Sequence, residues 1–328
     1  MKKIVVGLSI SLVSSSVFAI ENGTTVDWQN DFDDMVKNNC TGLVIGGNQV
    51  LTAAHCTDLT SITFANGDVV NASGRVDHPS YLWSGSGSQY DVSVWTLPEA
   101  ANTKNIHYFA DLNVQNVNLG DDIRVYGFGG NYPLSYAVVS IDRLSSSWHT
   151  AHQGNVVVGN TIQGDSGGAW FHNNEVIGVH RGSGGSLTSG TDLHYAKDFL
   201  LEQINGWHYP TVLKGTGTQT VKVQSLHQNS VVDSATSSGD VTITGGTCQT
   251  LPAIDAFDTC TYELDVSGSG QLHLTTNTTN EVIDINPVTP TPVPPPTTTP
   301  SSGGSGGSLG VFSLLGLAVF GRLRKRQV

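Results

Sequence analysis

Three residue types that cooperate in nucleophilic catalysis occur in this sequence, each in a distinctive local context. Ser166 lies within Gly164-Asp165-Ser166-Gly167-Gly168, His55 ends the run Leu51-Thr52-Ala53-Ala54-His55, and Asp91 follows Tyr90. A serine hydroxyl is a weak nucleophile until a base takes its proton, a carboxylate orients that base, and backbone donors bind the oxyanion. The three residues therefore predict acyl-transfer chemistry through a Ser-His-Asp site.

The order His, Asp, Ser, with these flanking residues, resembles the chymotrypsin/trypsin family of serine endopeptidases. The resemblance covers residues 20–213 and implies an all-β fold, a double six-stranded antiparallel β-barrel followed by a C-terminal helix. It also implies Ser166 as nucleophile, His55 as base and then acid, and Asp91 as the carboxylate that holds His55. The backbone N–H groups of Gly164 and Ser166 would form the oxyanion hole. Protein and peptide substrates are implied, with no metal ion and no organic cofactor.

Each of these signals also has a simpler interpretation. The glycine-rich string could be a plain loop, a histidine before a cysteine is often structural, and Asp91 could cap a turn. An inactive homologue, or a binding protein that uses the fold as a scaffold, would keep parts of the pattern. The three signals occur together and in the family order, which favours an active enzyme.

Asp165 has its own expected role by the same resemblance. In the family this residue turns inward and pairs with a newly cut N-terminal amine, which orders the oxyanion hole and the specificity pocket. Ile20-Glu21-Asn22-Gly23 fits the family's new N-terminus and follows Ala19 directly. We therefore expect signal peptidase itself to expose Ile20 and create the ion pair of Ile20 with Asp165. A short propeptide cut elsewhere is the alternative.

The expected specificity pocket departs from the trypsin pattern. Asn160 stands where trypsin-like enzymes have an acid, and an amide cannot pair with Lys or Arg as a carboxylate does. Ile162 replaces a pocket cysteine of the family, and His180-Arg181-Gly182 replaces its Ser-Trp-Gly wall. Asp192 could enter the pocket from another wall. The sequence thus predicts an endopeptidase but does not assign its P1 preference.

The sequence predicts that the segments around the candidate catalytic residues are mainly β-strands. Charged residues make up only 13% of the chain, and the stretches between its 38 glycines are rich in Val, Ile and Thr. We expect strands at residues 44–45 and 50–51 around a turn at 46–48, and another strand over 123–129. Apolar residues at helical spacing predict a helix within 195–207.

Residues 217–286 change character. Polar and apolar residues alternate over 220–223, 240–244, 261–266 and 271–274, with Gly, Ser or Asn between these segments. This pattern predicts a small antiparallel domain, an immunoglobulin-like β-sandwich. Adhesin, substrate-docking module and inert spacer remain open as its role.

Four cysteines in an exported chain indicate two disulfides. The spacing of Cys40 and Cys56 is that of the histidine-loop disulfide in the trypsin-like family. Cys248 and Cys260 then pair locally, where a loop of this length contributes about 3 kcal/mol in the chain-entropy model.

Both ends of the chain have the composition of processing segments. Residues 1–19 combine a basic start, a short apolar core and a small-x-small site, which predicts a secretory signal peptide. The alternative is a buried N-terminal strand. Residues 287–308 form a Pro/Thr-rich and then Gly/Ser-rich linker, an extended spacer.

Residues 309–328 combine a short apolar helix with a basic end, and together with the preceding glycines they resemble the GlyGly-CTERM sorting tail of Gram-negative bacteria. That resemblance implies cleavage by a rhombosortase-type intramembrane protease. As a helix, the apolar run would be about 20 Å long, against about 30 Å of hydrocarbon. A plain membrane anchor is the alternative, and either way the tail associates with a membrane, transiently or permanently.

The net charge of the chain limits which classes of binding partner are expected. Six of the 15 Lys and Arg residues lie in the two terminal segments, so the central part carries the remaining nine against 27 acids. This acidic balance excludes a basic patch for nucleic acid. The expected location is outside the cell or on the surface of a Gram-negative bacterium.

Overall fold

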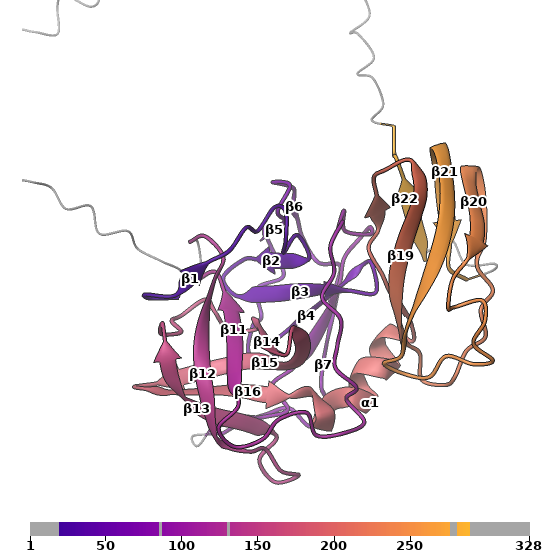
Figure 1. The fold of residues 1–328 in the computed structure, drawn as a ribbon. Coiled ribbons are helices and arrows are strands. Elements are labelled where there is room, and N and C mark those ends of the chain that lie inside the picture. Colours follow the sequence, from indigo (N-terminus) through magenta and orange to yellow (C-terminus); the bar gives the residue numbers. More distant parts are fainter. Residues whose placement is uncertain (1–19, 85–86, 130–131, 276–280, 289–328) are drawn as a thin grey trace, which may run out of the picture. The chain divides into compact units, whose positions relative to one another are not determined.

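The computed structural model describes residues 20–84, 87–129, 132–275 and 281–288 (Figure 1). The predicted signal peptide, nearly all of the predicted linker and the predicted sorting tail lie outside these residues. Two seven-stranded antiparallel sheets and a third sheet of six strands form the framework of the described chain.

The first sheet carries the segments on either side of His55 and has the order β6-β5-β2-β3-β4-β10-β7. The hairpin of β3 and β4 turns at Gly46 and Gly47, whose φ angles of 56° and 81° favour glycine, and it confirms the predicted pair of strands. The strands of this sheet are β2 (Met35–Lys37), β3 (Thr41–Ile45), β4 (Gln49–Thr52), β5 (Ile62–Thr63), β6 (Val69–Val70), β7 (Gly74–Asp77) and β10 (Ser93–Thr96).

The second sheet closes into a barrel of six strands. Its order is β1-β12-β11-β14-β15-β16-β13, and an additional pairing of β12 with β13 closes the ring, with β1 attached outside it. The strands are β1 (Thr24–Thr25), β11 (Asp122–Gly127), β12 (Ser135–Arg143), β13 (Ala151–Val158), β14 (Ala169–His172), β15 (Glu175–Gly184) and β16 (Leu187–Asp192).

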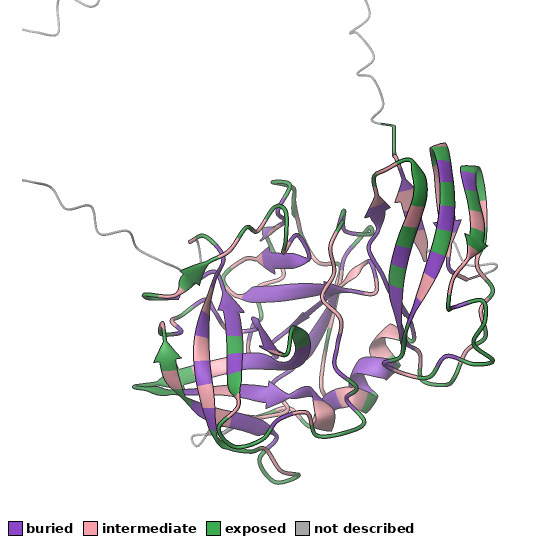
Figure 2. Cartoon of the chain, in the orientation of Figure 1, coloured by how far each residue is buried: buried purple, intermediate pink, exposed green. Residues whose placement is uncertain are grey.

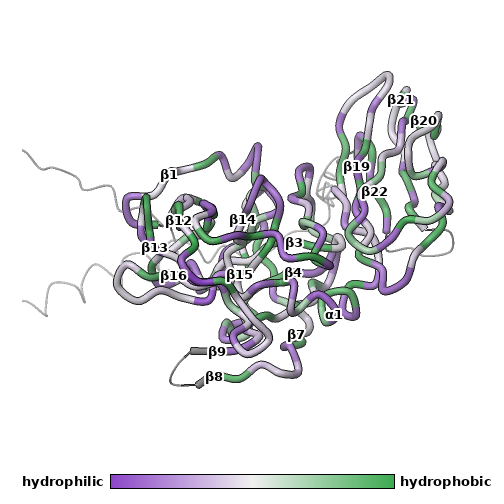
Figure 3. Tube along the Cα trace, turned by 60° about the horizontal axis from the view of Figure 1, so that its bottom comes forward, coloured by the Kyte–Doolittle hydropathy of each residue, from purple (hydrophilic) through white to green (hydrophobic). Residues whose placement is uncertain are grey.

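The predicted all-β, double-barrel architecture is confirmed, with one difference. The barrel of β11–β16 is closed, whereas β6 and β7 remain the two edges of the first sheet, which is therefore a half-barrel. A short hairpin of β8 (Leu82–Ser84) and β9 (Gly87–Gln89) stands out beside β7 (Figure 3).

The interior of both sheets is apolar. Figure 2 shows β3 and β4 buried along most of their length. One large cluster of buried side chains runs from Val44 and Leu51 in the first sheet to Phe171 and Val179 in the second. A separate cluster around Trp170 fills the closed barrel. The shared cluster holds the two sheets together, because separating them would expose it to water.

Helix α1 (Leu193–Ile204) follows the second sheet. Its N-cap is Asp192, whose carboxylate accepts from the His194 N–H, and it ends at Asn205, which adopts a left-handed conformation with φ of 39°. The helix predicted within residues 195–207 is present, but it begins at Leu193 and ends at Ile204. The cap at Asn205 ends it before Trp207. The part of the chain that the structure describes contains no helix long and apolar enough to span a membrane.

The third sheet joins six strands in the order β17-β19-β21-β22-β18, with β20 pairing to β21. It consists of β17 (Gly206–His208), β18 (Val212–Leu213), β19 (Gly217–Leu226), β20 (Thr236–Gly245), β21 (Thr259–His273) and β22 (Val282–Ile285). Its hydrogen bonds form one sheet and not the two separate sheets of an immunoglobulin-like sandwich. It also begins at Gly206, inside the segment expected to belong to the barrels.

Strand β21 corrects a further expectation. The segments 261–266 and 271–274 were predicted as two strands separated by a turn, yet β21 runs through the intervening Ser and Gly residues. The reason is pairing on both sides, since Gly270 lies opposite Gly239 of β20 and Ile285 of β22. Alternating burial along β21, visible in Figure 2, turns Tyr262, Leu264 and Val266 into the core of this sheet.

Gln224 of β19 connects the third sheet to the segment that joins the two barrel sheets. Its side chain is fully buried and donates to the carbonyls of Phe109 and Phe257, both at 2.8 Å. Its carbonyl accepts from the Phe109 N–H at 2.9 Å. One amide thus satisfies three buried backbone groups.

We expect Gln224→Met to lower the free energy of unfolding by about 3 kcal/mol, because a side chain of similar shape would leave those backbone groups buried without partners. Chemical denaturation measures the change. Gln219→Met is the control, since Gln219 bonds only to the exposed Thr216 carbonyl. Equal stability of the two variants would contradict the role given to Gln224.

Candidate active site

His55 and Asp91 lie side by side because the strands next to them are paired. His55 follows the end of β4, Asp91 precedes β10, and Thr52 lies opposite Ser93 in the ladder. The His55 Nδ1 atom is 2.7 Å from Asp91 Oδ2, and the His55 backbone N–H donates to Asp91 Oδ1 at 2.9 Å. Since a carboxylate only accepts, Nδ1 carries a proton and Nε2 is left as the basic nitrogen.

The Asp91 carboxylate is fully buried, whereas about a quarter of the His55 side chain, 23%, is exposed. The second sheet also contacts this pair, since Thr191 Oγ1 of β16 donates to the Asp91 carbonyl at 3.2 Å. The histidine is therefore oriented from its buried side and open on its other side. Thr191 was not among the predicted site residues, and its type alone carries no signal for this contact.

The turn around Ser166 depends on glycine. Gly164 and Gly167 have φ angles of 101° and 84°, which favour glycine. A Cβ on Gly167 would lie 2.0 Å from Thr52 Oγ1 and 2.2 Å from the Thr41 carbonyl oxygen. No other residue fits there, so the turn can approach the end of β4 closely.

Several contacts fix this turn near His55. The Ser166 carbonyl accepts from the Thr41 N–H at 2.8 Å and lies 3.8 Å from the Cys56 sulfur, next to His55 in the chain. Ser166 is half-buried. Among the described residues, the backbone N–H groups of Gly164 and Ser166 have no hydrogen-bond acceptor. Two backbone donors thus remain available beside the serine.

Both expected disulfides are present. Cys40 and Cys56 are joined by an S–S bond of 1.98 Å, and Cys248 and Cys260 by one of 2.02 Å. The first bond ties the segment before β3 to His55's neighbour, and the second joins β21 to the segment after β20. No cysteine in the chain is free to bind a metal.

Asp165 turns its carboxylate into the protein. It is fully buried and accepts from the N–H groups of Gly129 and Ile162, each at 2.7 Å. Burial raises the pKa of Asp165 to about 7, against the opposing effect of these two N–H donors. A buried carboxyl with such a pKa would be ionised at neutral pH if a cation approached it.

The segment that begins at Ile20 docks beside the same loop. The Ile20 side chain is fully buried, and Glu21 exchanges two backbone hydrogen bonds with Asn160, at 2.9 and 2.8 Å. A Cβ on Gly159 would lie 3.0 Å from the Ile20 side chain. These contacts bring Ile20 close to the chain that leads into Asp165.

The residues predicted for the specificity pocket do not all line one pocket. Arg181 and Gly182 line a pocket of about 290 Å³ together with Trp83, Leu187, Thr188 and Ser189. Asn160 is exposed, and its backbone pairs with Glu21. His180 is buried beneath the Ser166 turn, where its carbonyl accepts from the Gly167 N–H at 2.8 Å.

Asp192 has a different role from the expected one. Its carboxylate caps α1 through His194, accepts from Ser145 Oγ at 2.5 Å, and lies 3.2 Å from His152 Nε2. Burial raises the pKa of Asp192, but the hydrogen bonds from His152, Ser145 and His194 outweigh this effect and hold it below its ordinary value. The carboxylate is committed to these partners, and its expected place in the specificity pocket is corrected to a helix cap.

Trp83 is a candidate site residue that the sequence analysis did not predict. Its ring centroid is 5.7 Å from that of His55, although 63% of Trp83 is exposed. An exposed indole near the His55 ring offers an apolar surface at the edge of the candidate site. The available signal was a tryptophan within a Ser- and Gly-rich stretch.

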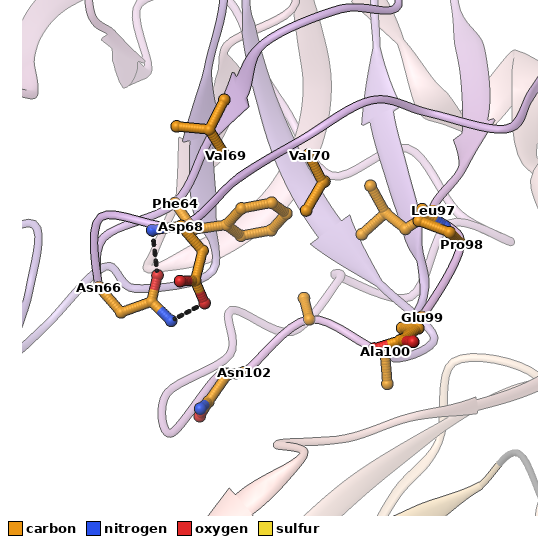
Figure 4. A pocket seen from close by; sticks show the side chains of 11 residues that line it. Phe64, Asn66, Asp68, Val69, Val70, Leu97, Pro98, Glu99, Ala100 and Asn102 are labelled. Atoms are coloured by element: carbon orange, nitrogen blue, oxygen red, sulfur yellow. Dashed lines mark hydrogen bonds between the residues drawn. The ribbon is translucent and has the colours of Figure 1, made fainter. Parts of the chain in front are cut away.

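A second pocket, of about 320 Å³, lies on the first sheet (Figure 4). Phe64, Val70, Leu97 and Pro98 supply its apolar wall. At its edge, Asn66 and Asp68 bond to each other through their side chains at 2.6 Å. None of the predicted site residues lines this pocket.

Comparison with known proteins gives matches among curated proteins and among solved structures. A trypsin of Saccharopolyspora erythraea is 29% identical over 199 residues, which cover 51% of this chain and 87% of that protein. Among solved structures, the Vibrio cholerae VesB protease is 18% identical with a TM-score of 0.45, and the match covers 81% of this chain and 98% of that one. Kallikrein-related peptidase 10 is 19% identical with a TM-score of 0.44, over 52% of this chain and 95% of that one.

The sequence profile of the Trypsin family matches residues 20–199, more than half of the chain. This segment contains the paired His55 and Asp91, the Ser166 turn and both barrel sheets. The chain therefore belongs to the trypsin family and is a serine-type endopeptidase, a hydrolase.

Proposed function

We propose that this protein is a secreted endopeptidase that cleaves proteins through Ser166, His55 and Asp91. The observation that carries the proposal is the His55–Asp91 pair, in which Nδ1 and Oδ2 are 2.7 Å apart and the carboxylate is fully buried. This geometry prepares His55 Nε2 as a base at the half-exposed edge of the site. The close approach of the Ser166 turn to Thr52 and Cys56 supports the same assignment.

In the proposed reaction, Ser166 Oγ attacks the carbonyl carbon of the substrate while His55 Nε2 takes the hydroxyl proton. The Gly164 and Ser166 N–H groups stabilise the oxyanion that forms. His55 then gives the proton to the amine as the C–N bond breaks, which leaves an acyl-enzyme. A water molecule repeats the sequence, with His55 as base and Ser166 as leaving group. Throughout, Asp91 holds His55 in one tautomer and stabilises its imidazolium form.

Activation is proposed to follow cleavage before Ile20. The new amine of Ile20 would supply the cation that the buried Asp165 carboxyl lacks in the uncut chain. Two observations support this step: the Ile20 side chain is already buried, and Glu21 is already paired with Asn160. A buried ion pair of this kind would hold the 164–168 turn in its active shape.

Specificity is proposed to differ from that of trypsin. Asn160 provides no carboxylate for Lys or Arg, and Asp192 caps α1. The Arg181 guanidinium, which lines the pocket beside Gly182, would repel a basic side chain. Substrates with uncharged side chains at the cleaved position fit this lining better.

Export and domain organisation remain proposals from the sequence. Residues 1–19 would be removed by signal peptidase, residues 20–213 would form the protease domain, and residues 217–286 a second domain. Residues 287–308 would act as a spacer and 309–328 as a sorting tail for a rhombosortase-type protease. The buried Gln224 amide, which bonds to Phe109 of the barrel region, favours a supporting role for the second domain over a freely moving one.

We expect Ser166→Ala to reduce peptide hydrolysis by about 10⁶-fold, because the nucleophile is removed, and Asp91→Asn by about 10⁴-fold, because His55 loses its tautomer. Steady-state kinetics on a peptide library measure both and also give the P1 preference. Ser140→Ala and Asp122→Asn are the matched controls, because both residues lie in the second sheet away from His55, and Asp122 is exposed. Undiminished hydrolysis in Ser166→Ala would refute the proposed mechanism.

Whether the Ile20 amine is free determines how the stability of the fold depends on pH. In an uncut precursor, Asp165 has a pKa of about 7 when folded and near its ordinary 3.8 when unfolded. Between these values the folded chain holds a proton that the unfolded chain has released, so raising the pH destabilises the fold, by up to about 4 kcal/mol. Asp165→Asn should abolish this loss, which chemical denaturation of the precursor at pH 5 and pH 8 would detect.

The cut enzyme should behave in the opposite way. With the Ile20 amine paired to Asp165, the ionised carboxyl stabilises the fold, so Asp165→Asn becomes the less stable form at pH 8. If the cut enzyme and the precursor respond alike to Asp165→Asn, or if the mature chain starts elsewhere than Ile20, the activation step is wrong.

A further inference from the structure

An arginine on an edge strand of the first sheet contacts the segment that carries His55. Arg75 lies in β7, which pairs with β10, and β10 pairs in turn with β4. The Arg75 Nη2 group donates a hydrogen bond to the Ala54 carbonyl. Only 18% of the Arg75 side chain is exposed, and Ala54 is fully buried. A charged guanidinium therefore satisfies a buried carbonyl group directly before His55.

Asp77 fixes the orientation of this guanidinium. Arg75 Nε donates to Asp77 Oδ1 and Nη2 donates to Asp77 Oδ2, both at 2.7 Å. The two residues are two positions apart in one strand, so their side chains lie on the same face of the sheet. Nη2 carries two hydrogens, one for Asp77 and one for the Ala54 carbonyl. A bidentate pair of this kind holds the planar guanidinium in one orientation.

The Ala54 carbonyl and the His55 N–H belong to the same peptide group. Its N–H donates to Asp91 Oδ1 at 2.9 Å, and its carbonyl accepts from Arg75. A cation therefore lies at the oxygen end of this peptide group and an anion at its hydrogen end. Both charges favour the same direction of the peptide dipole, so each strengthens the hydrogen bond made by the other. The peptide group that leads into His55 is thus held at both ends.

We propose that Arg75, oriented by Asp77, is a positioning residue for His55. This inference rests on the proposed function. Asp91 holds the His55 ring and the backbone N–H, at 2.7 and 2.9 Å. Arg75 holds the other end of the same peptide group, which cannot rotate without breaking a charge-assisted hydrogen bond. The direction in which His55 Nε2 points therefore depends on strand β7 as well as on Asp91.

A purely structural role for Arg75 has different consequences. If the Arg75–Asp77 pair only stabilised the edge of the sheet, its loss would lower stability but leave the turnover of the folded enzyme unchanged. If Arg75 positions His55, its loss lowers kcat in the folded enzyme. KM changes little in that case, because Arg75 bonds to Ala54 and Asp77 and not to the pocket beside Gly182.

The two members of the pair have opposite effects on the protonation of His55. The Arg75 cation disfavours the protonated ring, and the Asp77 anion favours it. Loss of Arg75 should therefore move the acid limb of the kcat/KM profile to higher pH, and loss of the Asp77 charge should move it to lower pH. Asp91 and the other titratable or charged side chains that interact with it stay the same in every variant; these are Tyr81, His180 and Arg181.

The test measures steady-state kinetics of the mature enzyme on a peptide substrate over a range of pH. We expect Arg75→Met, which keeps the length of the side chain but has no donor, to lower kcat by about 10-fold with little change in KM. Arg75→Lys keeps a charged donor and should recover part of this loss. Asp77→Asn should lower kcat by about 3-fold, because Arg75 is then less firmly oriented.

Arg124→Met is the matched control. Arg124 is an exposed residue of β11 in the second sheet, and it donates to Asn174 Oδ1 at 3.4 Å. This variant should leave kcat, KM and the pH profile unchanged. Thermal unfolding of every variant separates misfolding from altered chemistry. If Arg75→Met does not fold, Arg75→Lys and Asp77→Asn decide the question through kcat and the position of the acid limb.

Wild-type kcat in folded Arg75→Met, or in both Arg75→Lys and Asp77→Asn, would overturn the proposal, as would an equal loss of kcat in the Arg124→Met control. Ser166→Ala, measured in parallel, distinguishes this failure from failure of the proposed function. If Ser166→Ala abolishes hydrolysis while the Arg75 and Asp77 variants behave like wild type, only the role of Arg75 is wrong.

Discussion

The buried Asp91 carboxylate is the group on which the other features of the candidate site depend. It binds His55 through both the ring and the backbone, at 2.7 and 2.9 Å, and its own backbone is held by Thr191 of the other sheet. A charge in this place must be matched by hydrogen bonds, because burial without them would be very unfavourable. The bonds that satisfy the carboxylate are the same ones that orient His55.

The contact between the two barrel sheets fixes the turn that carries Ser166 against the first sheet. Gly167 fits against Thr52 and the Thr41 carbonyl, and the Thr41 N–H binds the Ser166 carbonyl. These partners come from the first sheet, while His180 supports the turn from the second. The shared apolar core holds the two sheets in a fixed position relative to each other. The geometry of the site and the packing of the core are therefore linked. A change in that packing would be felt at Ser166.

Buried polar side chains also stabilise the fold at positions away from the candidate site. Asp192 caps α1 and binds Ser145, and Gln224 joins the third sheet to Phe109. Each satisfies several donors or acceptors that would otherwise be buried alone. The Gln224 bonds therefore tie the third sheet to the segment that joins the two barrel sheets.

The sequence by itself indicated the all-β architecture, the hairpin around Gly46 and Gly47, the cysteine pairing and the reaction class, because these depend on local patterns and on residue types in a characteristic order. It did not reveal that β21 is continuous, that Asp192 caps a helix, or that His180 is buried against Trp170. Those outcomes depend on partners distant in the chain, such as Ile285 for Gly270 and Gly190 for the Trp170 ring. A side chain's type states which bonds it can form, but only the packed structure decides which partners are within reach.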